Sequence, residues 1–140
     1  MINKLFIGFL FGVMFSANVF ASDNTNILSS LAKQQGFFFF YSSSCPHCQH
    51  FAPVLKRFSK LHGFKVVAIS IDGGFLPSFP DAVMNENQDK LFKVTVFPSL
   101  FLVNPRTQLV ALVSEGNIDG AELTARVLKI NQMQTKGGSL

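Results

Sequence analysis

The stretch FFFFYSSSCPHCQHFAP, residues 37–53, contains both cysteines of the 140-residue chain, Cys45 and Cys48. Four phenylalanines before them belong to an apolar run of strand length, and apolar residues recur at helical spacing from Phe51 onward. A disulfide between Cys45 and Cys48 closes almost no loop, so it would remove little entropy from the unfolded chain. The pair therefore indicates a reaction centre rather than a structural cross-link.

The residues on either side of the cysteines predict a strand, a helix and a second strand. Residues 36–42 are apolar without alternation, which is typical of a strand buried on both faces. The helix is predicted to begin at Pro46 and to end at Gly63, with a kink at Pro53. FKVVAISID, residues 64–72, predicts the second strand. This order forms a βαβ unit with a parallel pair of strands.

The remaining sequence predicts the other elements of an α/β domain. After a turn-rich segment at 73–85, we expect a short helix at 86–93 and a hairpin of strands at 95–104 and 109–116. A closing helix is predicted over 119–133, capped by Asp119 and with Leu123, Val127 and Ile130 on its apolar side. The expected fold is thioredoxin-like, with a central mixed sheet flanked by helices and the CxxC pair at the first strand–helix junction.

The distribution of apolar, polar and charged residues along the chain predicts the domain organisation. Residues 1–21 have the pattern of a secretory signal peptide, in which Lys4 precedes an apolar run and cleavage follows Ala21. An uncleaved membrane anchor is the alternative, but the uncharged stretch is short for a membrane span. Cleavage would remove this apolar segment, so no stable membrane insertion is expected afterwards. Export would place the protein in the periplasm, where a cysteine pair can be oxidised. The rest is predicted to comprise a polar leader at 22–35, with a candidate short helix at 27–36 that Gly36 stops, a thioredoxin-like domain at 36–131 and a disordered tail at 132–140.

The charge distribution and the spacing of possible metal ligands argue against nucleic-acid binding and metal binding. The net charge is +4 and the basic residues are scattered, so no nucleic-acid partner is expected. Cys45, His47, Cys48 and His50 raise the alternative of a zinc or copper site. A closed metal site needs four converging ligands, and the chain has no second CxxC and no HxxxH motif. We therefore expect no metal, and no cofactor other than the redox-active Cys45–Cys48 disulfide.

Cys45 is predicted to be the nucleophile of the pair. It lies immediately before a helix, where free N–H groups and the positive dipole end stabilise a thiolate and lower the thiol pKa. Cys48 is one turn further on and is predicted to resolve the mixed disulfide that Cys45 forms. Pro46 stiffens the turn, and His47 is expected to stabilise the Cys45 thiolate. A stable thiolate favours the dithiol form, so the CPHC motif indicates an oxidising disulfide.

The dipeptide Phe97-Pro98 is the second predicted part of the site. In a thioredoxin-like fold the proline that begins the strand facing the cysteines is usually cis, and a cis bond is expected here. It would shape a groove beside Cys45, in which the backbone of Phe97 pairs with an extended substrate segment. An ordinary trans proline at a strand start is the alternative.

Three segments carry a resemblance to a known family: CPHCQHFAPVLKRFSKLHGFKVVAISIDGG at 45–74, LPSFPD at 76–81 and VTVFPSLFLVNPRTQLV at 94–110. They resemble the TraF/TrbB family, thioredoxin-fold proteins encoded with F-type conjugative transfer systems, a branch of type IV secretion. The likeness covers roughly residues 36–130. Its motif residues in this chain are Cys45, Cys48 and Pro98.

The resemblance implies partners as well as chemistry. The substrates would be cysteine-containing envelope proteins of pilus and channel assembly, and a membrane redox partner would recycle the cysteine pair. Longer members of the family carry an extra N-terminal region, of which this chain has almost none. Thioredoxins also place a buried acid six residues before the first cysteine, where this chain has Phe39.

The sequence thus predicts a periplasmic thiol-disulfide oxidoreductase, with oxidase or isomerase activity ranked above reductase activity. The alternative is a non-catalytic scaffold subunit of the secretion apparatus, whose disulfide is static. Solvent access to Cys45 distinguishes the two, because an enzyme needs an exposed thiol of low pKa.

Overall fold

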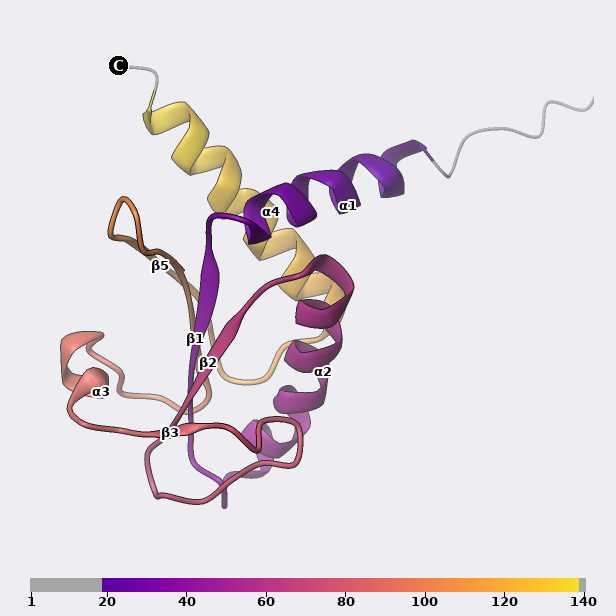
Figure 1. Cartoon of the computed structure of the whole chain (residues 1–140). Coiled ribbons are helices and arrows are strands. Elements are labelled where there is room, and N and C mark those ends of the chain that lie inside the picture. The colour runs from indigo at the N-terminus through magenta and orange to yellow at the C-terminus, as the bar shows by residue number, and fades with distance from the viewer. Residues whose placement is uncertain (1–18, 139–140) are drawn as a thin grey trace, which may run out of the picture.

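A sheet of five strands forms the centre of the molecule (Figure 1). The computed structural model describes residues 19–138, so most of the predicted signal peptide lies outside the described residues. The strands are β1 (Gly36–Tyr41), β2 (Val66–Ser70), β3 (Val83–Met84), β4 (Ser99–Asn104) and β5 (Leu109–Glu115). Their order is β3-β2-β1-β4-β5. β1 pairs in parallel with β2 and antiparallel with β4, which confirms the predicted mixed sheet.

Helices cover the two faces of this sheet unequally. They are α1 (Val19–Ala32), α2 (Pro46–His62), α3 (Gln88–Leu91) and α4 (Gly120–Gly137). α1, α2 and α4 contact one another on one side of the sheet, whereas the short α3 lies on the other side (Figure 1). The larger core therefore lies between the sheet and the three long helices.

β1 is buried on both faces, as its uninterrupted apolar run predicts. Phe37, Phe39 and Tyr41 belong to the core beneath the long helices. Phe40 points to the opposite face, where its ring contacts those of Phe92 and Phe101. This alternation follows from the pleat of a strand, and it leaves no polar face on β1.

α2 begins and ends where the sequence predicts. Pro46 is in its first turn, and the backbone N–H of Gly63 closes it by donating to the carbonyl of Ser59 at 2.8 Å. Gly63 has φ +84°, a left-handed conformation that favours glycine at a helix end. Phe51 and Leu55 on the inner side are fully buried. Burial of this side fixes the helix on the sheet, and with it the position of the cysteines.

The predicted polar leader is mostly helical: the segment 22–30, expected to be loose, belongs to α1, and the candidate helix at 27–36 is the second half of this longer helix. α1 continues to Ala32, with Leu28 and Leu31 buried in the main core. These two leucines lie one turn apart, so their burial supplies the apolar stripe that a surface helix needs. The predicted cleavage point after Ala21 falls within α1, and cleavage itself stays a prediction.

The tail predicted to be disordered is also helical over most of its length. α4 runs to Gly137, past the expected end at residue 133. Nε2 of Gln35 donates to Oε1 of Gln134 at 2.9 Å, which ties the last turns of α4 to the segment before β1. Residues 139–140 lie outside the described part of the chain.

Other predictions for the second half of the chain are confirmed. β4 and β5 form the expected antiparallel pair. The carboxylate of Asp119 caps α4 by accepting from the N–H of Glu122 at 2.8 Å, and the predicted apolar residues Leu123, Val127 and Ile130 are buried. The two-residue β3, paired with β2, was not predicted. Within residues 19–138 no helix has the length and apolar character needed to cross a membrane.

Candidate active site: a cysteine pair at a helix start

The two cysteines lie at the amino end of α2, in different environments. Cys45 is the N-cap residue, with extended backbone angles (φ −80°, ψ 119°), and is partly exposed. Cys48 is on the first turn and is fully buried. Both are free thiols in this structure. An accessible sulfur therefore lies outside an inaccessible one, which is the geometry that thiol–disulfide exchange requires of a nucleophile and its resolving partner.

The two thiols also differ in acidity. Burial raises the pKa of Cys45, but hydrogen bonds with the backbone and thiol of Cys48 and with the backbone of His47 outweigh it, and the pKa ends below its ordinary value. Burial raises the pKa of Cys48 to about 12, and the charges of Cys45 and Asp72 add to the increase. The outer sulfur therefore ionises at a lower pH than the inner one.

Phe97-Pro98 lies against the cysteine pair, as predicted. The peptide bond between them is cis. The Cys45 thiol donates to the backbone carbonyl of Phe97, with an Sγ–O distance of 3.9 Å. Pro98 is buried, and its carbonyl accepts from the N–H of Gly116 at 2.7 Å, which anchors this segment to the end of β5. A fixed backbone edge therefore borders the accessible sulfur.

The histidines of the motif are oriented toward solvent. His47 and His50 are both exposed. The group of His47 that lowers the pKa of Cys45 is its backbone, so the predicted effect of the imidazole stays a prediction. In the described part of the chain, no group of three or more His, Cys, Asp and Glu side chains is arranged to hold a metal ion.

Sequence reasoning missed Asp72, which follows β2. Its Oδ2 accepts from the Ser42 hydroxyl at 3.0 Å, and from the backbone N–H and hydroxyl of Ser43 at 3.0 and 2.8 Å. Its Oδ1 accepts from the Ser70 hydroxyl at 3.2 Å and the Gly74 N–H at 3.1 Å. Burial opposes ionisation, but the bonds from Ser43, Gly74 and Ser42 outweigh it and hold the pKa of Asp72 well below its usual range.

The sequence contained a clue to this network. Three serines, 42–44, follow β1, and Asp72 follows β2 with two glycines after it. Because the carboxyl ends of parallel strands meet at one edge of a sheet, the serines and the aspartate had to be neighbours.

Gly74 is required by a close approach within the network. A Cβ at this position would overlap the Ser43 hydroxyl and lie 2.6 Å from the Ser43 Cβ. Gly74→Ala is therefore expected to lower the free energy of unfolding by about 1–3 kcal/mol, because the turn formed by residues 42–44, the serine turn, must move. Denaturant unfolding measures this, with Gly120→Ala as the matched control, since nothing lies within 4 Å of a Cβ there. Equal stability of the two variants would contradict the packing argument.

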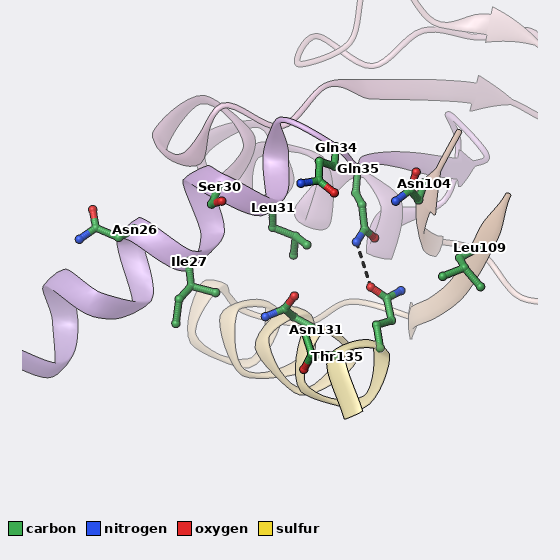
Figure 2. Close-up of a pocket in the computed structure, with 11 residues that line it drawn as sticks. Asn26, Ile27, Ser30, Leu31, Gln34, Gln35, Asn104, Leu109, Asn131 and Thr135 are labelled. Atoms are coloured by element: carbon green, nitrogen blue, oxygen red, sulfur yellow. Dashed lines mark hydrogen bonds between the residues drawn. The ribbon is translucent and has the colours of Figure 1, made fainter. Parts of the chain in front are cut away.

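A separate hollow of about 570 Å³ lies between α1 and α4 (Figure 2). Its lining carries no charged side chain and is rich in amides, from Asn26, Gln34, Gln35, Asn104, Asn131 and Gln134. Gln35 directly precedes β1, whereas Cys45 follows the end of the same strand. The hollow is thus at the opposite end of β1 from the cysteines, and it is not part of the dithiol centre.

Comparison with solved structures identifies the fold. A putative thiol:disulfide interchange protein DsbE from Chlorobium tepidum has a TM-score of 0.55 and 22% identity, over 73% of this chain and 83% of that one. StoA from Bacillus subtilis has a TM-score of 0.54 and 17% identity, over 67% of this chain and 82% of that one. With the five-stranded sheet and flanking helices, these likenesses show that the fold is thioredoxin-like.

Comparison of sequences identifies relatives. Protein TraF of Escherichia coli K12 is 30% identical over 105 residues, which are 75% of this chain and 42% of that protein. Protein TrbB of the same organism is 34% identical over 98 residues, which are 67% of this chain and 54% of that protein. The chain thus spans about half the length of these relatives. The family described as "TraF: F plasmid transfer operon protein" matches residues 16–128, and the chain belongs to this family.

Proposed function

We propose that the protein is a periplasmic thiol-disulfide oxidoreductase that oxidises or isomerises cysteine-containing envelope proteins during assembly of the conjugative pilus and its type IV secretion channel. One observation carries the proposal: a partly exposed Cys45 of lowered pKa lies at a helix start beside the Phe97 carbonyl, with a buried Cys48 one turn behind it. A static disulfide needs neither accessibility nor an asymmetric pair of thiols.

The reaction transfers two electrons from a client dithiol to the Cys45–Cys48 disulfide. A client thiolate attacks Sγ of Cys45, the bond between the two cysteines breaks, and Cys48 leaves as a thiolate that takes a proton from solvent. A second client thiolate then attacks the client sulfur of the mixed disulfide, and Cys45 leaves as a stabilised thiolate. The client gains a disulfide and the enzyme becomes a dithiol. A membrane redox partner is proposed to accept the two electrons and restore the enzyme disulfide.

The properties of Cys48 favour oxidation and isomerisation over reduction. A reductase needs its inner thiol to attack the mixed disulfide, which requires a thiolate. Burial, the largest cause of the raised pKa of Cys48, persists when Cys45 is part of a mixed disulfide, so the Cys48 thiolate stays disfavoured there. The strand position at which thioredoxins carry an acid is occupied by Phe39, which is fully buried and cannot take this proton. Because attack by Cys48 is slow, a second client thiol can attack the mixed disulfide first and complete the disulfide of the client.

The surroundings of the site suit a peptide client. The Phe97 backbone borders Cys45, and an extended client segment is proposed to pair with it. A hollow of about 400 Å³ that Ser43 helps to line has mainly apolar side chains around it, including those of Phe75 and Leu76. Membership of the TraF family and the predicted signal peptide support the envelope location and the clients of the transfer apparatus.

The proposal is tested by trapping clients on Cys45. In Cys48→Ala the inner thiol is missing, so mixed disulfides with clients are expected to accumulate in the native host and to disappear on reduction. Non-reducing electrophoresis and mass spectrometry identify the trapped proteins, and Cys45→Ala is the matched control that cannot form them. A Cys48→Ala protein that captures nothing, in cells where loss of both cysteines leaves DNA transfer unchanged, would support the scaffold alternative.

A further inference from the structure

Phe75 is a large apolar residue that the structure holds in contact with solvent. It is 60% exposed, whereas the next residue, Leu76, is only 3% exposed. On its other side, the carbonyl of Gly74 accepts from the hydroxyls of Tyr41 at 2.9 Å and Ser70 at 2.7 Å. The backbone is therefore anchored on both sides of Phe75, and the exposure of this ring follows from the fold itself.

The exposed ring borders the hollow of about 400 Å³, the Phe75 hollow. One wall comes from the loop after β2, with Phe75, Leu76 and Pro77, and the other comes from α2, with Ala52 and Pro53. The described residues that line it carry no charge. A charged group would lose hydration there without a counter-charge, so the hollow favours an apolar side chain. Ligand pockets in proteins have roughly 300–1,000 Å³, so there is space for one large side chain.

Two lining residues connect the Phe75 hollow to the cysteine pair. They are Ser43 in the serine turn and Gln49 in α2, and Nε2 of Gln49 donates to the carbonyl of Ser43 at 2.9 Å. The backbone N–H of Gln49 also donates to the carbonyl of Cys45 at 3.0 Å. Ser43 is two residues from Cys45, so their Cα atoms lie within about 7 Å of each other. The hollow and the reactive cysteine are therefore within reach of one short peptide segment.

The Phe75 hollow and Phe97 lie on opposite sides of the cysteines. β1, which leads to Cys45, lies between β2 and β4 in the sheet. The hollow includes the loop after β2, whereas Phe97 lies just before β4. A client segment that crosses Cys45 can therefore contact the Phe97 backbone with one end and the hollow with the other.

We propose that the Phe75 hollow is a client subsite, which binds an apolar side chain about two to four residues from the client cysteine that reacts with Cys45. This spacing follows because three residues of extended chain span about 10 Å. The inference rests on the proposed function, because it names the class of client segment that the dithiol centre selects. It gives Phe75 a role in the choice of client.

The expected size of the selection follows from the apolar surface that binding removes from water. Full burial of a phenylalanine or leucine side chain changes an equilibrium by roughly 10- to 150-fold. Phe75 is itself largely exposed, so the hollow covers a bound side chain only in part. We therefore expect a preference of about tenfold for an apolar over a polar side chain at this spacing.

The test measures the exchange of synthetic peptides onto Cys45. In Cys48→Ala protein, Cys45 is first joined to thionitrobenzoate as a mixed disulfide. A peptide thiolate then attacks Sγ of Cys45, the bond to the thionitrobenzoate sulfur breaks, and the coloured thionitrobenzoate thiolate leaves. Absorption of the released thiolate gives the rate constant of exchange for each peptide.

Three peptides with one cysteine and blocked termini separate the effects of composition and spacing. The first has phenylalanine three residues before and three residues after its cysteine, and the second has serine at both positions. The third has its two phenylalanines nine residues from the cysteine. The first peptide is expected to exchange about ten times faster than either of the others.

Variants in the Cys48→Ala background assign this selectivity to the hollow. Phe75→Ala is expected to reduce the ratio between the first two peptides from about tenfold to about twofold, whereas Phe75→Leu keeps an apolar wall and most of the ratio. Leu61→Ala is the matched control, because Leu61 is a 70% exposed apolar residue near the other end of α2, and it should keep the full ratio. If Phe75→Ala fails to fold, as judged by circular dichroism, Phe75→Gln replaces it.

Three results would overturn the proposal. The first is equal exchange of the phenylalanine and serine peptides, and the second is a ratio that the folded Phe75→Ala variant leaves intact, which would place the apolar contact elsewhere. The third is fast exchange of the peptide with distant phenylalanines, which would show unspecific attraction. Synthetic peptides report on the hollow whether or not envelope clients exist. Failure here is therefore distinguishable from an empty client trap, which would remove the proposed function instead.

Discussion

At pH 7, iodoacetamide is expected to modify Cys45 of the reduced, folded protein at least about a hundred times faster than Cys48. With a pKa of about 12, Cys48 is a thiolate in only about one molecule in 10⁵, whereas a pKa below 9.0 leaves Cys45 ionised in more than about one in 100. The more basic thiolate is intrinsically more nucleophilic, which offsets about thirtyfold of this difference. The complete burial of Cys48 restores the selectivity.

The alkylation rate of Cys45 should also depend on pH, because only the thiolate reacts. The alkylation rate of Cys45 should rise with pH and reach half its maximum below pH 9.0, since its folded-state pKa lies under that value. Peptide mass mapping after timed quenching measures both rates. Protein unfolded in urea is the control, and there the two cysteines should react at similar rates. Similar rates in the folded protein would contradict the assignment of Cys45 as the nucleophile.

This asymmetry between the cysteines could be predicted in part from the sequence. The position of Cys45 before a helix that starts at Pro46 follows from local patterns, because the apolar stripe and the proline fix where the helix begins. The cis bond at Pro98 was predicted from its place at the start of the strand that faces the cysteines, and it is confirmed. The first inference depends on local residues, whereas the second depends on the expected fold, which places the start of this strand opposite the cysteines.

The parts that sequence reasoning missed depend on contacts between distant segments. Asp72 binds serines about thirty residues earlier in the chain, and only the parallel pairing of β1 with β2 brings them together. Only the first half of α1 was missed, because residues 22–26 are polar and the buried leucines of the helix, Leu28 and Leu31, lie in its second half. The length of α4 was underestimated for a similar reason, because Gln134 is held by Gln35, 99 residues away.

Replacement of Phe39 by alanine is expected to lower the free energy of unfolding by about 3–5 kcal/mol. Phe39 is fully buried at the centre of β1. Its ring lies 5.3 Å from that of Tyr41, 5.7 Å from that of Phe51 in α2 and 5.5 Å from that of Phe79, measured between ring centroids. The cavity would therefore remove contacts with the sheet, with the helix that carries the cysteines and with the loop after β2.

Phe75→Ala is the matched control for this substitution, because it removes the same atoms from a ring that is 60% exposed. It should change the stability by no more than about 0.5 kcal/mol. Guanidinium unfolding of the reduced proteins measures both values, and a loss below about 1 kcal/mol in Phe39→Ala would mean that the site collapses around the cavity. The position at which thioredoxins use an acid for proton transfer would then be dispensable for packing here.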